Sequence, residues 1–272
     1  MKWMPVQSKE LIFKGHILLK PTIKHIFSQS VPNMLPKKLT ESRWMWFLKG
    51  LPVLPRAAAM FRARRYTMTT PVRCRRLWDS CKQVLDANVP GGFVECGVWK
   101  GGSSAIMALA IKNSGQKRHL HLFDSFEGLP EPTEIDGEKA VTYSGGRKDG
   151  NLATISECRA ELDEVRHLIL DEIKVPEALA HFHVGWFQNT VPIDARQLGP
   201  IALLRLDGDW YDSTKICLQH LYPLLSPSGI IIIDDYWTWD GCRKAADEYR
   251  NKSNITSPIQ HIDGDAGFWV KK

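Results

Sequence analysis

Five short strand-like segments alternate with segments of amphipathic helical pattern, and this alternation limits the fold more than any other feature of the chain. Each strand-like segment ends at a glycine or an acidic residue: FVECG (93–97), HLHLFD (119–124), AHFHVG (180–185), IALLRLD (201–207) and GIIIIDD (229–235). Amphipathic helices are expected at 72–87, 102–112, near 213–224 and near 241–251, and further short strands near 259–263 and 267–270. The order indicates βαβ units and a mostly parallel sheet that helices cover on both faces. We therefore predict a doubly wound α/β domain over residues 66–272.

The first 65 residues differ from this domain in charge. They carry 13 lysines and arginines against two glutamates, a net charge of +11, whereas residues 66–272 have a net charge of −5. Six prolines limit the length of any helix there, so we expect a basic extension of short helices. Because the body is acidic, no nucleic-acid partner is expected. The aromatic and basic extension suits peripheral contact with an anionic membrane, packing on the acidic body, or a homo-oligomer interface.

Composition also bears on the compartment. No apolar run approaches the roughly 18 residues that span a bilayer. Lys14 and Lys20 interrupt the apolar start of the chain, which therefore lacks the pattern of a signal peptide. The six cysteines are scattered without a C-x-x-C pair, as suits a reducing compartment. We expect a cytoplasmic protein, with peripheral contact at the inner face of the membrane as a further role for the extension.

The strand ends carry the candidate ligand site, because ligands of such folds bind at the carboxyl edge of the sheet. The first strand leads into a glycine loop that starts at Gly97 and opens a helix at Ser103, which offers backbone amides to a ligand. The second strand ends at Asp124 and Ser125, where a carboxylate can accept hydrogen bonds from a ribose diol. The glycine spacing is not that of dinucleotide-binding proteins. These residues predict a nucleoside-type cofactor.

A cluster of aspartates follows the fourth and fifth strands. Asp207 and Asp209 project to one side of extended backbone, and Asp234 and Asp235 end the next strand. Crowded carboxylates repel one another and take up protons unless a cation neutralises them. Oxygen ligands suit a hard divalent ion, Mg²⁺ first and Ca²⁺ or Mn²⁺ as alternatives. We predict that Asp207, Asp234 and Asp235 bind this metal.

Two histidine pairs also alternate along strands. His119 and His121 share one face of the second strand, and His181 and His183 share one face of the third. Because neither pair has matching histidine or cysteine ligands at metal-binding spacing nearby in the sequence, we interpret both pairs as structural.

Six segments of the chain resemble the macrocin-type sugar O-methyltransferases. They are YTMTTPVR (66–73), VPGGFVECGVWKGGSS (89–104), LFDSFEGLPEP (122–132), VGWFQNTVP (184–192), IALLRLDGDWYDST (201–214) and LYPLLSPSGIIIIDDYWTWDGCRKAADEYR (221–250). They occur in the family's order over about residues 66–270. The resemblance implies a class I methyltransferase fold with a seven-stranded, mostly parallel Rossmann-like sheet. It also implies S-adenosylmethionine as cofactor, Mg²⁺, and a sugar hydroxyl of a glycoside, polysaccharide or natural product as acceptor.

The resemblance assigns a role to each motif residue. At the cofactor, Glu95, Gly97 and Ser103 would line the methionine end, Asp124 with the following Ser125 would hold the ribose, and Gly185 and Trp186 would flank the adenine. The metal would be bound by Asp207, Asp234 and Asp235. The general base would be Asp209. The segment 66–71 would help to close the site. The family more often has leucine where this chain has Trp210, a change that bears on the shape of the acceptor pocket.

The chemistry agrees with these residues, but other functions stay open. A metal bound to neighbouring sugar hydroxyls lowers their pKa, and Asp209 can then remove the proton. The same aspartates would serve an O-methyltransferase of a catechol or small phenol. A nicotinamide-dependent oxidoreductase is a second alternative, which the glycine spacing disfavours. A non-catalytic protein that binds an anionic surface through residues 1–65 is the third.

Overall fold

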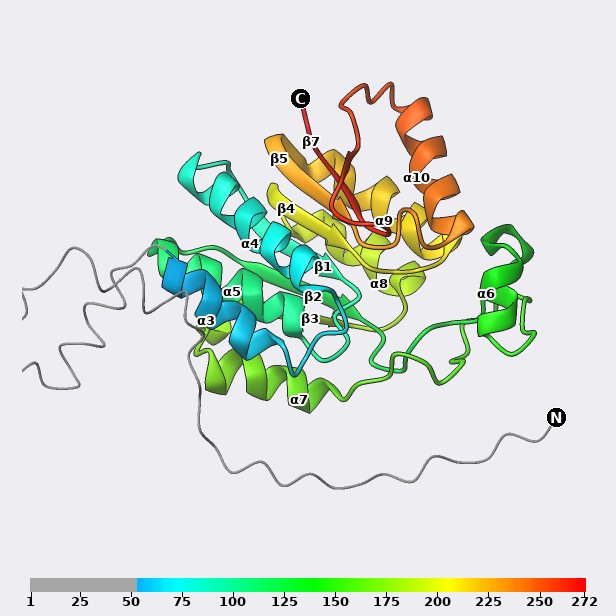
Figure 1. Cartoon of the computed structure of the whole chain (residues 1–272), viewed down its shortest axis with the longest axis horizontal. Helices are drawn as coiled ribbons and strands as arrows, with labels where there is room; N and C mark the ends of the chain where they lie inside the picture. Colours follow the sequence, from blue (N-terminus) through cyan, green and yellow to red (C-terminus); the bar gives the residue numbers. More distant parts are fainter. Residues whose placement is uncertain (1–52) are drawn as a thin grey trace, which may run out of the picture. The chain divides into compact units, whose positions relative to one another are not determined.

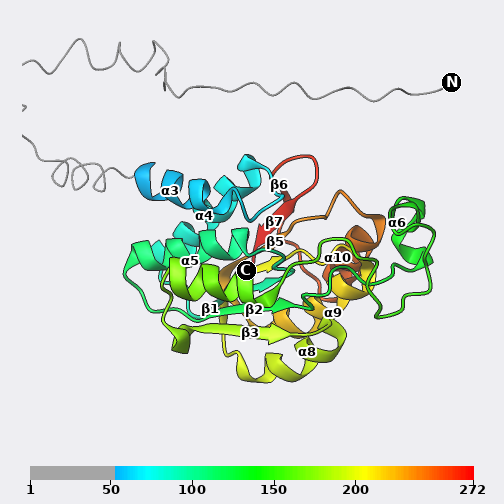
Figure 2. The ribbon, with the colours of Figure 1, turned by 90° about the horizontal axis from the view of Figure 1, so that it is seen from below.

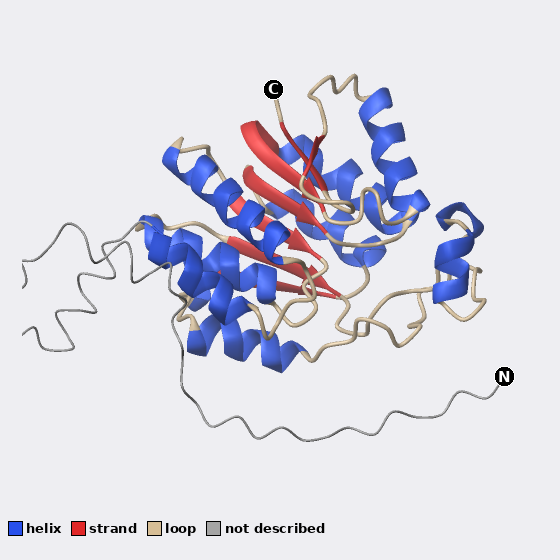
Figure 3. Cartoon of the chain, viewed as in Figure 1, coloured by secondary structure: helices blue, strands red, loops and turns tan. Residues whose placement is uncertain are grey.

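A computed structural model of the chain describes residues 53–272, which contain a seven-stranded sheet (Figures 1 and 3). The strands are β1 (Gly92–Cys96), β2 (Leu120–Asp124), β3 (Ala180–Val184), β4 (Ile201–Leu206), β5 (Leu225–Ile233), β6 (Gln260–His261) and β7 (Gly267–Val270). Their order across the sheet is β3-β2-β1-β4-β5-β7-β6. Strands β1 to β5 pair in parallel, whereas β7 is antiparallel to β5 and β6. The expected doubly wound, seven-stranded and mostly parallel sheet is confirmed.

Helices cover both faces of this sheet (Figures 1 and 2). One face packs against α4 (Pro71–Asp86) and α5 (Gly102–Ser114), on which α3 (Val53–Ala63) lies, and the other packs against α8 (Phe187–Asp194), α9 (Tyr211–Leu221) and α10 (Asp240–Lys252). Strand order reverses between β1 and β4, so the site is expected at the carboxyl ends of these central strands. Within residues 53–272 no helix has the length and apolar character needed to cross a membrane.

The central strands are apolar on both sides because both sides are covered. Every residue of β4 is buried, and Leu203 and Leu204 belong to the cores on opposite faces. Ile232 and Ile233 of β5 alternate in the same way. This double burial explains why these strands are continuous apolar runs in the sequence and not alternating patterns.

Two local features of the sequence position the start of α4 and the loop after β1, both of which lie next to the site. Thr70 caps α4 by accepting a hydrogen bond from the backbone amide of Arg73 at 3.2 Å, and Pro71 occupies the first turn. Gly97 has φ of 89°, and a Cβ there would lie 1.8 Å from the carbonyl oxygen of Asp207. The loop after β1 can therefore approach β4 closely only with glycine at position 97.

The folded body begins before residue 66. Helix α3 packs on α4 and α5, and its Ala59 and Ala63 are buried in the core. The core therefore includes α3 from Val53 on, although these positions lie before the expected boundary at residue 65. The basic character of the first 65 residues does not mark where the folded body begins, because α3 itself contains Arg56 and Arg62. The predicted membrane, subunit or body contacts of the extension fall mostly on residues 1–52, which lie outside the described residues.

The long polar connection between β2 and β3 contains short helices that the sequence did not indicate. They are a 3₁₀ turn at Glu134–Asp136, α6 (Glu138–Tyr143), α7 (Leu162–Arg166), a π-helical turn at His167–Glu172 and a 3₁₀ turn at Glu177–Leu179. The buried carboxylate of Asp136 anchors the first part of this segment by accepting a hydrogen bond from the Tyr211 amide at 2.6 Å. Tertiary contacts of this kind, which leave little periodicity, stabilise such short helices.

Candidate active site

A cavity of about 260 Å³ opens at the carboxyl ends of the central strands. The residues predicted for the site that line it are Gly97, Asp124, Ser125, Trp186, Asp207, Asp209, Asp234 and Asp235. The structure thus brings together strand ends that are up to 138 positions apart in the chain. Glu95, Ser103 and Gly185 are not among the lining residues.

Asp124 holds the glycine loop in place at one side of the cavity. Its Oδ2 accepts hydrogen bonds from the backbone amides of Val98 at 2.7 Å and Trp99 at 2.9 Å, and its Oδ1 accepts one from Phe126 at 2.7 Å. Burial raises the pKa of Asp124, and the amides that donate to its charged form act in the opposite direction. The carboxylate therefore joins the ends of β1 and β2 and also contributes to the cavity wall.

The four aspartates lie at the ends of β4 and β5, which β1 separates from Asp124 of β2. The pairing of Leu206 with Ile233 in parallel strands places Asp207 beside Asp234. Carboxylate oxygens of Asp207, Asp234 and Asp235 all lie within 4.8 Å of one another. Burial raises the pKa of Asp235 well above its usual value, and the neighbouring charges of Asp209, Asp207 and Asp234 raise it further.

Asp209 occupies a separate position in this group. Its backbone has φ of 57°, in the left-handed region, and its Oδ1 accepts a hydrogen bond from the indole Nε1 of Trp239 at 2.8 Å. Burial, followed by the charge of Asp207, raises the pKa of Asp209 to about 7. The side chain is thus oriented at the cavity wall by one fixed donor.

Two arginines that sequence reasoning missed neutralise part of the cluster. The buried guanidinium of Arg205 forms ion pairs with Glu95 at 2.8 Å, Asp207 at 2.9 Å and Asp234 at 2.8 Å. Arg73, at the start of α4, pairs with the other oxygen of Asp234 at 2.7 Å. A charged residue inside the apolar run IALLRL was the signal for Arg205, because a buried charge requires partners. We find no comparable signal for Arg73.

These contacts give Glu95 a supporting position. Its Oε1 accepts from Arg205, and its Oε2 accepts from the hydroxyl of Ser104. Burial raises its pKa to about 7, although Arg205 opposes the shift. Glu95 is fully buried and contacts the cavity indirectly, through the arginine that holds Asp207 and Asp234.

The aspartates fit a hard cation even with the arginines present. Both oxygens of Asp234 face guanidinium groups, and one oxygen of Asp207 faces Arg205. In contrast, the Oδ2 of Asp235 is buried without a hydrogen-bond partner among the described residues. A buried carboxylate oxygen with no donor is a strong sign of a missing ligand. Together with an all-oxygen donor set, it meets the requirements of a Mg²⁺-type ion.

Aromatic residues form part of the cavity wall. Trp239 and Tyr143 of α6 line it with ring centroids 5.5 Å apart. Met68 and Thr69 of the segment 66–71 also line it. Trp210 does not: it is buried behind Trp239, with its Nε1 donating to the carbonyl oxygen of Pro130 at 2.9 Å. Trp210 therefore bears on the pocket by supporting Trp239.

Comparisons with known proteins agree with this site. Residues 56–271 match the family model described as macrocin-O-methyltransferase. The 8-demethyl-8-(2,3-dimethoxy-alpha-L-rhamnosyl)-tetracenomycin-C 4'-O-methyltransferase of Streptomyces olivaceus is 38% identical over 75% of this chain and 75% of its own. The mycinamicin III 3''-O-methyltransferase of Micromonospora griseorubida is 33% identical over 75% of this chain and 78% of its own.

A solved structure supports the same conclusion. The O-methyltransferase NovP superposes with a TM-score of 0.65 at 31% identity, covering 76% of this chain and 82% of NovP. The calicheamicin methyltransferase CalS11 shares the fold, with a TM-score of 0.59 at 20% identity over 84% of this chain and 90% of CalS11. The family match spans the cavity and the strand ends that form it. The chain therefore belongs to the macrocin-O-methyltransferase family and is an S-adenosylmethionine-dependent O-methyltransferase.

Proposed function

We propose that this enzyme methylates a sugar hydroxyl of a glycosylated natural product and that it requires a divalent metal ion, Mg²⁺ first. The relative from Streptomyces olivaceus is named for a rhamnosyl acceptor, which supports the sugar class. The observation that carries the proposal is the order of the strand ends that line the cavity. Asp124 ends β2, the aspartates follow β4 and β5, and β1 with its glycine loop lies between them.

The glycine-loop side suits the cofactor. Gly97 admits a ligand close to the backbone, and Asp124 holds the loop while its carboxylate reaches the cavity. In this proposal Asp124, with Ser125 next to it, accepts from the ribose, and Trp186 packs on the adenine. Glu95, Ser103 and Gly185, which do not line the cavity, would support the loops next to Asp124, Ser125 and Trp186.

The aspartate side suits the metal and the acceptor. Asp207, Asp234 and Asp235 would hold the ion, and ion pairs with Arg73 and Arg205 hold the carboxylates of Asp207 and Asp234 in place. A hard divalent cation at this position lowers the pKa of the hydroxyls that it coordinates and orients them. The buried, unpartnered Oδ2 of Asp235 is the structural feature that favours the ion.

In this proposal Asp209 acts as the general base. Trp239 fixes its carboxylate at the cavity wall, and the backbone of this residue is held by the D-G-D turn after β4. The acceptor oxygen forms a bond to the methyl carbon while the methyl–sulfur bond breaks, and its proton passes to Asp209. Positioned proton transfer of this type contributes about 10²- to 10⁴-fold to the rate.

The test is a methyl-transfer assay by mass spectrometry with a rhamnosyl glycoside and, in parallel, a catechol. Asp209→Asn is the test variant. Asp212→Asn is the matched control, because Asp212 is an exposed aspartate three positions further along the chain. We expect Asp209→Asn to lower kcat about 10²-fold or more while the affinity for S-adenosylhomocysteine, measured by calorimetry, stays within about twofold.

Each result bears on a separate part of the proposal. Methylation of the glycoside that stops in excess chelator and returns with Mg²⁺ supports the sugar acceptor and the metal. Full activity in chelator removes the metal. Methylation of the catechol alone removes the sugar acceptor. Activity of Asp209→Asn close to that of Asp212→Asn removes Asp209 as the base.

A further inference from the structure

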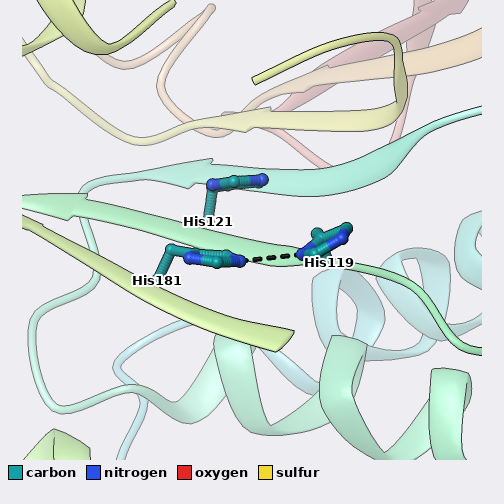
Figure 4. Close-up of side chains that lie close together, drawn as sticks. All are labelled: His119, His121 and His181. Carbon is teal, nitrogen blue, oxygen red and sulfur yellow. Dashed lines mark hydrogen bonds between the residues drawn. The ribbon is translucent and has the colours of Figure 1, made fainter. Parts of the chain in front are cut away.

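Four histidines that are far apart in the chain form one cluster on the sheet. Strands β2 and β3 are parallel neighbours in which His121 pairs with His181, so His119 and His121 share a face with His181 and His183. The ring centroids of His121 and His181 lie 4.5 Å apart, and those of His119 and His181 lie 5.0 Å apart. The pair His119 and His121 thus has a further histidine, His181, beside it on the neighbouring strand (Figure 4).

Three of these imidazoles converge closely enough to share an ion. One ring nitrogen each from His119, His121 and His181 lies within 4.8 Å of the other two. Zinc–nitrogen bonds of about 2.0–2.1 Å place ligand atoms about 3.4 Å apart in a tetrahedron. The Nδ1 of His119 and the Nε2 of His181 lie 2.8 Å apart in a hydrogen bond, which a bound ion would replace. His119 is exposed, His181 is partly exposed and His121 is buried, so the cluster opens to solvent at one end.

Hydrogen bonding from a carboxylate orients the buried ring. Asp194 of α8 accepts from Nδ1–H of His183 at 2.8 Å. The Nε2 of His183 then accepts from Nδ1–H of His121 at 3.2 Å. This chain leaves the lone pair of His121 on Nε2, free for a further ligand. Carboxylate-to-histidine hydrogen bonding is the arrangement that fixes the tautomer of metal-binding histidines.

Burial favours the neutral form of His121 and His181, which is the form that binds metals. Burial, followed by the neighbouring histidines His181, His183 and His119, lowers the pKa of His121 to about 3. Burial also lowers the pKa of His181. Among the described residues the ligand group consists of imidazoles alone, in contrast to the all-oxygen group at the cavity. Imidazole donors favour Zn²⁺, Ni²⁺ and Cu²⁺ over Mg²⁺.

We propose that His119, His121 and His181 form a second metal site, specific for a zinc-type transition-metal ion. The site is separate from the cavity, since none of the three residues lines it. A bound ion would link the edge strand β3 to β2. Strand β3 leads directly to Gly185 and to Trp186 at the cavity wall, so this link would also steady that loop.

The test measures zinc binding by the untagged full-length chain in excess Mg²⁺, which saturates the aspartates. Equilibrium dialysis with elemental analysis gives the stoichiometry and affinity, and X-ray absorption gives the ligand type. We compare wild type with His119→Asn and His181→Asn, whose side chains are not buried, and use His220→Asn of α9 as the matched control.

We expect one zinc ion per chain in wild type and in His220→Asn, with imidazole scattering in the absorption spectrum. Loss of one ligand should weaken binding at least about tenfold in His119→Asn and His181→Asn. Saturating zinc should raise the Tm of wild type by roughly 5 °C. Circular dichroism and binding of S-adenosylhomocysteine show that the variants are folded.

Two outcomes overturn the proposal. Zinc affinity that is equal in wild type, His119→Asn and His181→Asn excludes these ligands. Zinc that persists in those variants but is lost in Asp235→Asn places the ion at the aspartates. Neither outcome depends on methyl transfer, so the second metal site and the proposed acceptor chemistry are tested separately.

Discussion

The sheet carries two clusters of ionisable side chains, and they tolerate crowding in opposite ways. In the aspartate cluster at the carboxyl edge, Arg205 and Arg73 form ion pairs with Asp207 and Asp234 and so offset part of the repulsion between the carboxylates. In the histidine cluster on β2 and β3, burial and the neighbouring imidazoles lower the pKa of His121 and His181, which disfavours their protonated forms. Crowding is thus relieved by fixed opposite charge in the first cluster and by loss of charge at His121 and His181 in the second.

Among these predictions, the substitution of Arg205 should have the largest effect on stability. Arg205→Met leaves Glu95, Asp207 and Asp234 facing one another in a buried site. We expect the free energy of unfolding, measured by urea denaturation, to fall by about 3–5 kcal/mol.

The matched control is Lys82→Met, which breaks the exposed ion pair between Lys82 and Asp86. That change should lower the free energy of unfolding by no more than about 0.5 kcal/mol. Losses of equal size in the two variants would show that the buried carboxylates do not depend on Arg205.

A third way to hold a buried carboxylate is seen at Asp124, whose partners are backbone amides and not guanidinium groups. Asp124→Asn replaces one acceptor oxygen by an NH₂ donor that faces N–H groups. We expect this conflict to distort the glycine loop and weaken binding of S-adenosylhomocysteine about 10- to 100-fold in calorimetry. Asp149→Asn, at an exposed aspartate, is the control. An unchanged affinity in Asp124→Asn would mean that the loop forms without this carboxylate.

The sequence was sufficient for the sheet because its signals are local. Runs such as GIIIIDD and the glycine that follows β1 indicate buried strands and their functional ends without knowledge of their neighbours. The aspartate cluster was predictable for the same reason: the carboxyl ends of parallel strands meet at one edge. In both cases the pattern within a short segment already contains the spatial information.

Contacts between distant segments were not predictable in this way. Arg73 lies 161 positions from Asp234, and its ion pair depends on how α4 packs on the sheet. The histidine pairs appeared structural because strand order, which makes β2 and β3 neighbours in register, is not visible in either segment. The short helices between β2 and β3 depend on anchors such as Asp136, whose partner Tyr211 is 75 positions away.

The lowered pKa of His121 predicts a pH dependence of stability. The pKa of His121 is about 3 in the folded protein and about 6.5 in the unfolded chain. Between these values the unfolded chain binds more protons, so stability is complete above pH 6.5 and falls as the pH decreases. The free energy of unfolding should fall by about 1 kcal/mol per pH unit in this window.

The comparison of wild type with His121→Asn isolates this contribution, with chelator present and urea denaturation at pH 7.5, 6.5 and 5.5. Asp209, whose pKa is raised to about 7, has the opposite sign, because the folded protein then binds the extra proton. Since Asp209 is present in both proteins, its effect cancels in the difference. Parallel pH profiles would show that His121 has the same pKa in the folded protein as in the unfolded chain.

The smallest effect is expected at the carboxylate that serves the histidine cluster. Asp194 accepts from His183, which fixes Nδ1–H on both His183 and His121. Asp194→Ala should lower the free energy of unfolding by only about 1 kcal/mol, because His183 retains its stacking on Phe123 with ring centroids 3.9 Å apart. Nitrogen NMR of labelled histidine should nevertheless show a change from the Nδ1–H form to a mixture of tautomers. A wild-type spectrum with Nε2–H on His121 would contradict the hydrogen-bond chain itself. In that case Asp194 would not control the lone pair on Nε2 of His121, the feature that distinguishes this cluster from the aspartates.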